Sequence, residues 1–562
     1  MDLSSCSASC GDAKSASDTG RVRQMQASAL RGFVAILAAG VAATTIFVVA
    51  GAASSPDLTT FTNVAAANTK TPGFAAPNIL SPELTEAAVA QGSVRLENGT
   101  AAVPFYGYDG DGTLVPLPGT NAEATKTEPD KNTYLVMNGL KGADPGYDYG
   151  THFLFQGHEA GAPGYITRVN LDADGAHRVT LLATADAAAP LPTFDGSTWD
   201  PWAKRLLFTA EFGAKTGVWQ ATLDVPAEVE DISGALGRGG YEAVQNDSHG
   251  NVWLVEDIGG TNGTGANVRA RQPNSFLYRF VPKNPKNLTK GKLQALQVIS
   301  LRTGQPVVFH AGQADADIVS DDMMDLHTYG KVFQTRWVTV HDTATDGNTP
   351  FNANALAKAK GATPLKRPEN GQFRPGSHFT EFYFDETGDT NALSSANANF
   401  GGWGAILKLT QASPSADTGT LTMFFKCDQA HSGFDNTAFF TRDRVAFVED
   451  AGDTLHAQRN ALDSGYLFDV TKDYSNPANQ PVRFLAQGRD PSATIDSSLL
   501  GSPGFHNEGD NEITGIHVSD GDPGTHGILG ARIPKPFDPE GHWRVFYTHQ
   551  HGDNVTYELL RG

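Results

Sequence analysis

From Phe153 to the C-terminus, short apolar stretches alternate with turn residues in a pattern that returns about six times. In each copy an apolar strand ends in an acidic or polar residue, a glycine-rich turn follows, and a second apolar strand comes next. Examples are LLFTAEFGAKTGVWQATL, VAFVEDAGDTL…SGYLFDV and WRVFYTHQHGDNVTYELL. A small sheet of this kind cannot bury both of its faces alone, so the repeats predict a closed ring of sheets.

The predicted fold class is therefore all-β: a six-bladed β-propeller preceded by an N-terminal hydrophobic targeting segment. Each repeat opens with a strand that should be the innermost of its blade. Turns at Ser248–Asn251 and Thr441–Arg444 then lead to the second strand, which is the pattern of a β-hairpin. We expect the last strand, near Val555–Leu560, to close the ring against an early segment around Tyr134–Asn138.

Composition along the 562 residues predicts four segments. Residues 1–31 form a basic region, residues 32–53 an apolar segment, residues 54–130 a tether leading into the first strands, and residues 131–562 the propeller. The apolar run suits either a cleaved signal peptide, cut near Ala50-Gly51-Ala52, or a retained membrane tether. In both cases the main domain is expected to be exported, to the periplasm or the extracellular space.

The formal net charge of −20 comes from 62 Asp and Glu against 42 Lys and Arg. This charge excludes a nucleic-acid partner, which needs a basic face. A solvated acidic surface and bound cations are the two explanations that stay open. Cys427 is the only cysteine after the apolar run. The propeller can therefore form no internal disulfide, and Cys427 is expected to be a buried thiol rather than a nucleophile.

Acidic residues recur at two positions of the repeats. They begin the opening strands at Glu242, Glu369, Asp435 and Glu512, and they close the following strands at Glu159, Glu211, Glu256 with Asp257, and Glu449 with Asp450. In an antiparallel hairpin these two positions lie at the same end, so both sets should meet at one mouth of the central channel. Clustered carboxylates are tolerated if they are protonated, paired with arginine or bound to metal ions. A high count of oxygen ligands favours calcium, and added histidine would permit manganese or iron.

The tripeptide Arg367-Pro368-Glu369 combines two chemistries in one place. Pro368 fixes the backbone between a guanidinium and a carboxylate. Glu369 could therefore hold a metal while Arg367 offers a planar fork to an oxyanion such as phosphate. The plain alternative is a surface arginine before a strand. Ligands or donors could also come from His158, His549 and His551, each of which alone is as well explained by a structural role.

These motifs, in this order, resemble the PhoX-type alkaline phosphatases, whose fold is a six-bladed propeller with a calcium- and iron-containing site. The resemblance covers roughly Leu135 to Leu560. Gly157-His158-Glu159 is similar to the family's Asn-His-Glu segment, Arg367-Pro368-Glu369 matches its Arg-Pro-Glu element, and NEITG and QHG are similar to its late elements. The resemblance implies a metal-dependent phosphoester hydrolase that acts on a small phosphoester. A monomer is the favoured oligomeric state.

Carried over residue by residue, the resemblance implies that Arg367 is the catalytic residue that binds the substrate phosphate. The predicted metal ligands, including the recurrent acid Glu256, are Glu159, Glu211, Glu242, Glu256, Asp257 and Glu369. One departure concerns the second repeat, where Ala210 stands in place of the family's iron-binding cysteine and Phe212 in place of a second glutamate. The calcium part of the site is therefore predicted to survive, and the iron part is left open.

Two other functions stay open at this point, because a fold does not settle a function. A calcium-dependent lactonase-like hydrolase would need a central calcium with mixed amide and carboxylate ligands. Asn246, Asn262 and Asn436 could supply the amides. A non-catalytic, calcium-stabilised binding propeller is favoured by the loss of the cysteine.

Overall fold

The structure, a computed structural model, describes residues 57–70, 77–114, 124–185, 190–488, 512–550 and 554–562. Strands make up most of its regular secondary structure. The predicted targeting segment, residues 32–53, lies outside the described residues. Among the residues that are described, no helix is long and apolar enough to cross a membrane. The strands pair antiparallel with their neighbours throughout the sheets that follow.

Four of the sheets are separate and contain four or five strands each. The first contains β3 (Thr133–Val136), β4 (His152–Gly157), β5 (Tyr165–Asn170) and β6 (Val179–Thr184), and the second contains β7 (Ser197–Asp200), β8 (Arg205–Thr209), β9 (Val218–Ala221) and β10 (Val229–Asp231). Near the C-terminus, one sheet has the order β20 (Phe434–Phe439), β21 (Arg444–Glu449), β22 (Ser464–Asp469), β23 (Val482–Ala486) and β1 (Ile79–Leu80). The last has the order β24 (Glu512–Ser519), β25 (Arg544–Gln550), β26 (Val555–Arg561) and β2 (Leu84–Ala90).

A fifth sheet has nine strands and contains two of the predicted units. Its first half is β11 (Tyr241–Asn246), β12 (Val252–Glu256), β13 (Leu277–Asn284) and β14 (Asn287–Val298), and its second half is β19 (Thr418–Lys426), β18 (Ala405–Gln411), β17 (Glu381–Glu386) and β16 (Gly371–Phe373). Between them lies β15 (Phe333–Asp342), which pairs with β14 on one edge and with β19 on the other. The prediction of six separate blades is corrected accordingly: this strand joins the outer edges of two units into one sheet.

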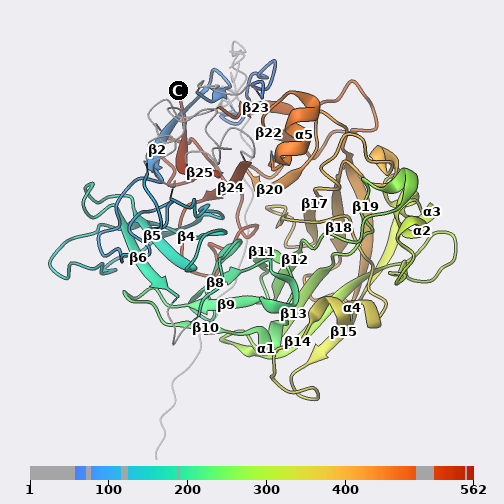
Figure 1. The fold of residues 1–562 in the computed structure, drawn as a ribbon, viewed down its shortest axis with the longest axis horizontal. Helices are drawn as coiled ribbons and strands as arrows, with labels where there is room; N and C mark the ends of the chain where they lie inside the picture. The colour runs from blue at the N-terminus through green and yellow to red at the C-terminus, as the bar shows by residue number, and fades with distance from the viewer. Residues whose placement is uncertain (1–56, 71–76, 115–123, 186–189, 489–511, 551–553) are drawn as a thin grey trace, which may run out of the picture. The chain divides into compact units, whose positions relative to one another are not determined.

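The sheets are arranged around a common centre, which makes the fold all-β and propeller-like (Figure 1). The innermost strands β3, β7, β11, β16, β20 and β24 contact one another in that order, and β24 contacts β3 again. The C-terminal strand β26 does not close against Tyr134–Asn138 as predicted, because its free edge is taken by β2, from Leu84 to Ala90. Two strands from the segment predicted as a tether, β1 and β2, thus cover the outer edges of the last two sheets.

The predicted hairpin turns are confirmed, and side chains fix their shape. Between β11 and β12, the carboxylate of Asp247 accepts hydrogen bonds from the backbone N–H groups of His249 and Asn251 at 2.8 and 3.1 Å. Gly250 has φ +75°, the left-handed conformation that glycine adopts without steric cost. Between β20 and β21, the hydroxyl of Thr441 accepts from the backbone N–H of Arg444 at 3.0 Å.

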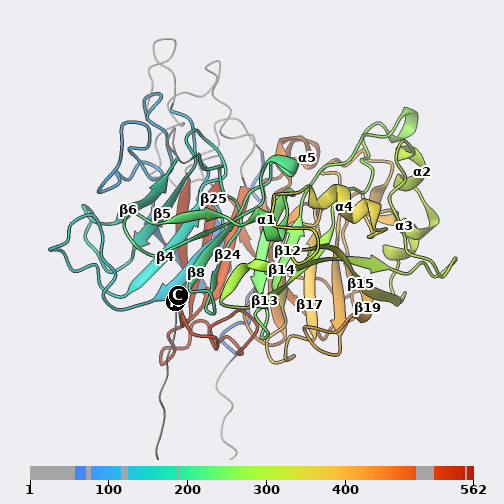
Figure 2. The same ribbon diagram turned by 90° about the horizontal axis from the view of Figure 1, so that it is seen from below.

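Helices are short and lie in the connections between strands. They are α1 (Ser233–Leu236), α2 (Ala314–Ile318), α3 (Asp321–Leu326), α4 (Ala353–Ala359) and α5 (Gly452–Arg459), with 3-10 turns at Gly213–Lys215, Gly265–Asn267 and Asn397–Asn399. In the side view, α5 lies beyond the ends of the neighbouring strands (Figure 2). It begins just after Asp450, at the end of β21 where the sequence predicts the mouth of the channel.

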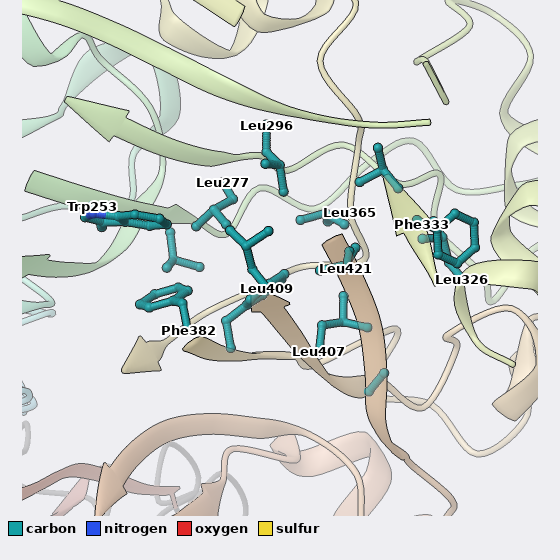
Figure 3. Packing of buried hydrophobic residues seen from close by; sticks show 14 of the residues in the cluster. Trp253, Leu277, Leu296, Leu326, Phe333, Leu365, Phe382, Leu407, Leu409 and Leu421 are labelled. Atoms are coloured by element: carbon teal, nitrogen blue, oxygen red, sulfur yellow. The ribbon is translucent and has the colours of Figure 1, made fainter. Parts of the chain in front are cut away.

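A large apolar core lies between the two halves of the nine-stranded sheet. The side chains that fill it include Trp253, Leu296, Phe382 and Leu407 (Figure 3). Trp253 packs edge-on against Trp337 of β15, with ring centroids 5.2 Å apart. Packing of this kind explains why the bridging strand stays in place, since β15 contributes both backbone pairing and buried aromatic area.

Replacing Leu407 with alanine should destabilise the protein strongly. The side chain is 1% exposed at the centre of this core, and its loss leaves a cavity worth about 2–5 kcal/mol in the free energy of unfolding. The matched control is Lys408→Ala in the same strand, a half-buried position where less than about 0.5 kcal/mol is expected. Urea unfolding at equilibrium measures both, and equal effects would contradict the core described here.

Candidate functional site

Five carboxyl groups meet where the first three sheets come together. Asp130, Glu159 and Asp195 bring ligand atoms within 4.8 Å of one another, and Asp195, Glu211 and Glu242 do the same. Asp130 and Asp195 precede the innermost strands β3 and β7, Glu159 and Glu211 follow β4 and β8, and Glu242 lies in β11. Asp195, Asp130 and Glu242 are buried, whereas Glu159 and Glu211 are partly exposed. We call these five residues the carboxylate cluster.

Local backbone features bring the strands of the cluster close together. The pairing of β11 with β12 shifts by a β-bulge between Tyr241 and Ala243, at the position of Glu242. Bulges re-aim a side chain and are frequent beside functional sites. On the facing strand, a Cβ at Gly196 would lie 2.0 Å from the carbonyl oxygen of Glu242. Only glycine allows this approach, which seats the beginning of β7 against β11.

The cluster contains oxygens that have no donor. Both carboxyl oxygens of Asp195 and Oε1 of Glu211 are buried and accept no hydrogen bond from any described residue. Burial, together with the charges of Asp130, Glu159 and Glu211, holds the pKa of Asp195 well above its usual range. Burial and the charge of Asp257 raise the pKa of Glu211 to about 8. Without a cation, these groups are therefore stable only when some of them are protonated.

Arg367 lies beside the cluster and is held between two of the predicted ligands. Its Nε donates to both oxygens of Asp257 at 3.0 Å, and its Nη2 donates to Asp257 at 2.7 Å and to Glu369 at 3.1 Å. Burial opposes the charge of Arg367, but the two carboxylates outweigh it and hold its pKa well above the usual value. Arg367 has φ +55°, a costly conformation for a non-glycine residue. Its Nη1 donates to none of the residues that the structure describes, and the side chain is 18% exposed.

The paired acids at the strand ends divide into one that faces the centre and one that does not. Glu256 is turned toward the neighbouring elements, where its Oε2 accepts from the backbone N–H of Phe276, the hydroxyl of Tyr278 and the amide of Asn354, each at 3.1 Å. Asp257, the next residue, binds Arg367 instead. The structure therefore places Glu256 outside the carboxylate cluster, while the other five predicted ligands lie in the cluster or on Arg367.

The second acid pair repeats this arrangement. Glu449 is bound by both terminal nitrogens of Arg459, at 3.1 and 3.0 Å, and by the backbone N–H groups of Ser432 and Ser464. Burial raises the pKa of the central acids Glu369 and Glu512, and the charge of Asp450 adds to this effect. The first residue of each pair thus stabilises the blade, and the second faces the channel.

The structure adds central residues that the sequence analysis missed. These residues are Asp130, Asp195, Lys131 and Asp385. Lys131 is 3% exposed, and Asp385 lies in β17. Asp130 and Asp195 lie two or three residues before innermost strands, close to the position that Glu369 occupies before β16. That signal was available for Asp195. Asp130 and Lys131 lie at the boundary of the segment predicted as a tether, so no repeat pointed to them.

Several candidate ligands have other partners. His158 is fully buried, stacks on Tyr165 with centroids 3.9 Å apart, and shares hydrogen bonds with the hydroxyls of Thr127 and Thr167. Asn246 donates to Asp200 at 3.0 Å, and Asn262 is exposed in a loop after β12, so the amides of a lactonase-like site are not gathered. His551 lies outside the described residues. Cys427 is a buried thiol, as predicted.

The residues of the cluster fit a hard divalent cation. All five side chains offer oxygen atoms as metal ligands. Several of these oxygens lack a hydrogen-bond partner among the described residues, and two of the side chains reach solvent. This donor set suits calcium better than a softer metal. Ala210, at the position where the resemblance implies an iron-binding cysteine, is buried in an apolar cluster with Phe208 and Trp219 and offers no ligand.

Comparison with known protein families gives one match, which covers part of the chain. The model of the family "Alkaline phosphatase PhoX" matches residues 233–488. These residues make up less than half of the chain. They include Glu242, Asp257, Arg367 and Glu369, whereas the remaining members of the carboxylate cluster precede the match. None of the curated proteins matches the chain.

One solved structure supports the same family at the level of the fold. PhoX from Pseudomonas fluorescens in complex with vanadate, a transition state analogue, is similar over 90% of this chain and 98% of its own, at 12% identity and a TM-score of 0.54. Sqt1 from Chaetomium thermophilum matches over 77% of this chain and 100% of its own, at 11% identity. Its TM-score of 0.28 is too low to carry an argument. The first match supports a PhoX-like, propeller-like fold.

Protein stripped of metal should lose stability as the pH rises from about 4.5 to about 8. The folded state holds a proton on Glu211 up to about pH 8, whereas the unfolded chain releases it near the ordinary value of 4.5. A raised acid pKa therefore lowers the free energy of unfolding across this window. Glu211→Gln mimics the protonated form and should flatten the decline, measured as thermal midpoint against pH. Exposed Glu230→Gln is the control, and equal declines in all three proteins would count against the buried, uncompensated state of Glu211.

Proposed function

We propose that this chain is a metal-dependent phosphoester hydrolase in which the carboxylate cluster holds metal and Arg367 binds the substrate phosphate. One observation carries the proposal: buried carboxyl oxygens without donors lie next to an arginine whose Nη1 is unused. The family match over residues 233–488 and the fold of the Pseudomonas protein support a phosphatase. The substrate class is a small phosphoester, because the groups available are a cation site and a single guanidinium edge.

The metal site would be formed by Asp130, Glu159, Asp195, Glu211 and Glu242, with Asp257 and Glu369 at its border. Calcium is the metal we propose, since every donor is an oxygen. A bound divalent cation would neutralise phosphoryl oxygens and lower the pKa of a water molecule. Iron is not part of the proposal, because the described residues of the cluster include no thiolate.

Arg367 would act by position and charge. Asp257 and Glu369 occupy its Nε and Nη2, which fixes the plane of the guanidinium and leaves the Nη1 edge for an oxyanion. A group fixed before the substrate arrives loses little freedom on binding and can stabilise the charge that develops during phosphoryl transfer. The costly backbone conformation of Arg367 is consistent with such a fixed role.

We further propose that the chain is exported through residues 32–53 and works as a monomer in the periplasm or outside the cell. Calcium is plentiful in these compartments, which suits a site made only of oxygen donors. The alternative, a calcium-stabilised binding propeller, would need the carboxylate cluster but not the free edge of Arg367. A catalytic test of Arg367 therefore separates the two functions.

Arg367→Ala should lower phosphomonoesterase activity by about a hundredfold or more, the usual effect of removing one contact to a developing charge. Calcium content should be nearly unchanged, because arginine is not a ligand. The matched control is Arg374→Ala, which removes an arginine that also pairs with two acids, Glu381 and Asp443, but lies on the other side of β16. If calcium-loaded wild-type protein hydrolyses no phosphoester, the proposed enzymatic function is wrong and the binding propeller is favoured.

Vanadate should inhibit the wild-type protein in competition with the phosphoester. The Pseudomonas fluorescens protein forms a complex with vanadate, and a transition-state analogue binds more tightly than substrate where the site stabilises the transition state. Arg367→Ala should weaken this inhibition together with the rate. Inhibition constants that do not change in the variant would place the oxyanion away from Arg367.

A further inference from the structure

Arg367 keeps a conformation that its own backbone disfavours. Its φ of +55° lies in the left-handed region, where the Cβ of a non-glycine residue is crowded. Pro368 follows, and a residue before proline prefers an extended backbone instead. A conformation of this kind persists only where the surrounding contacts over-determine it. The contacts that do so come from residues outside the carboxylate cluster.

The end of β17 binds the main chain at this point. Oε1 of Glu386, the last residue of β17, accepts from the backbone N–H of Lys366 at 2.7 Å. The backbone N–H groups of Thr387 and Gly388 donate to the carbonyl oxygens of Arg367 and Lys366, at 2.8 and 3.1 Å. The carbonyl groups on both sides of the Arg367 Cα are thus bound, which restricts the backbone rotation at this residue.

A histidine holds Glu386 in turn. Oε2 of Glu386 lies 2.8 Å from Nε2 of His327, and both side chains are 1% exposed. Nδ1 of His327 lies 2.7 Å from the carbonyl oxygen of Met323 in α3. Because a carbonyl oxygen only accepts, we assign a hydrogen to Nδ1. Both ring nitrogens therefore have a partner, and the carboxylate of Glu386 is fixed at both of its oxygens.

The side chain of Lys366 adds a buried ion pair. Its Nζ lies 3.1 Å from Oδ1 of Asp389, with both side chains 1% exposed, and it donates to the carbonyl oxygen of Arg271 at 2.6 Å. Asp389 also accepts from the backbone N–H of Arg271 at 3.0 Å and from the hydroxyl of Ser394 at 2.7 Å. A buried ion pair adds little net stability compared with apolar packing. Here it joins the residue directly before Arg367 to the loop that follows β12.

Two neighbouring strand ends hold Arg367 in complementary ways. The strand β12 ends at Glu256 and is followed by Asp257, whose carboxylate binds the guanidinium of Arg367. The strand β17 ends at Glu386 and is followed by Thr387, whose N–H binds the main chain of Arg367. One strand end thus fixes the head of the side chain, and the other fixes its base.

From these contacts we infer that Glu386 and the Lys366–Asp389 ion pair are positioning residues, which hold Arg367 in its disfavoured conformation and so keep its Nη1 edge in place for an oxyanion. The inference rests on the proposed function, which takes Arg367 as the group that binds phosphate. None of the three residues is proposed to touch the substrate. Without them, rotation of the backbone at Arg367 would carry the guanidinium away from Asp257.

Glu386→Leu tests the inference, because it removes the acceptor for the backbone N–H of Lys366. The amide of Thr387, which is bonded to Arg367, should exchange its hydrogen about tenfold faster relative to the amides within β17. The phosphomonoesterase kcat and the affinity for vanadate should each fall by about tenfold to a hundredfold, the cost of a misplaced binding group. Calcium content should be unchanged.

A double-mutant cycle shows whether the effect passes through the arginine. In a protein that already carries Arg367→Ala, the added Glu386→Leu should lower neither kcat nor vanadate affinity any further, since two changes in one chain of contacts are not additive. Two independent losses would show that Glu386 acts on another part of the site.

Two variants serve as controls. Glu386→Gln keeps both contacts, because its amide can accept from Lys366 and donate to Nε2 of a neutral His327, and should keep wild-type exchange, kcat and vanadate affinity. Asp247→Leu removes another fully buried carboxylate that accepts two backbone N–H groups, in the turn at the opposite end of the β11–β12 hairpin. It should lower the thermal midpoint without changing exchange at Thr387 or vanadate affinity.

A second variant covers the case in which Glu386→Leu does not fold. Lys366→Met combined with Asp389→Asn removes both buried charges together, so that neither is left unpaired. It should reproduce the faster exchange at Thr387 and the loss of vanadate affinity.

The outcomes separate this inference from the proposed function. Wild-type exchange at Thr387 in the variants that fold would overturn the inference, whether or not the wild type hydrolyses phosphoesters. Faster exchange at Thr387 in Glu386→Leu, with a wild type that neither hydrolyses phosphoesters nor binds vanadate, would support the hold on Arg367 and contradict the proposed function. Vanadate affinity that falls equally in Glu386→Leu and Asp247→Leu would also overturn the inference, because the loss would then follow from lower stability alone.

Discussion

The mutual repulsion of buried carboxyl groups around one axis is the constraint on which the rest of this structure depends. A ring of sheets brings equivalent positions of every repeat to the same place, and in this chain many of those positions are Asp or Glu. Described cations at the centre are few, Lys131 and Arg367 foremost. The remaining acids must bind protons or metal ions, because an unpaired buried charge costs several kcal/mol. The fold therefore gathers carboxyl groups that need bound protons or metal ions, and this need determines where the candidate metal site lies.

The carboxylate cluster and Arg367 come largely from two different parts of the chain. Residues 233–488 match the PhoX family and contain Arg367 with its two carboxylate partners. Asp130, Glu159, Asp195 and Glu211 come from sheets that precede this match, yet they meet Glu242 from within it. The carboxylate cluster offers oxygen ligands alone and Ala210 offers none, which is why calcium is the metal that we propose.

Much of the site could be predicted from the sequence, because acids at strand ends recur with the hairpins and the hairpins fix where strand ends lie. The sequence could not decide which member of the pair Glu256-Asp257 faces the channel. Neighbouring residues of a strand point to opposite faces, and the register depends on the bulge at Glu242 in the paired strand β11. Asp130 and Lys131 were missed because the first innermost strand stands before the first recognised repeat.

The architecture was predicted to the level of a closed, propeller-like ring but not in its connections. The strand β15 pairs with β14 on one edge, and its second edge finds β19 only through tertiary packing around Trp253 and Trp337. Closure by β2 was equally invisible, since the segment Leu84–Ala90 is rich in alanine and has no strong strand pattern. An exposed strand edge pairs with a segment that the completed fold brings close to it, whatever the intrinsic strand propensity of that segment.

The thermal midpoint of the metal-stripped wild-type protein, measured against increasing calcium concentration at pH 8, tests the central claim most directly. If the carboxylate cluster holds calcium in the folded state alone, the midpoint must rise continuously with the calcium concentration. The gain corresponds to about 2.7 kcal/mol at a hundredfold excess over the dissociation constant. A midpoint that stays constant from the stripped protein to calcium saturation would contradict the account, because the acids would then be balanced without metal.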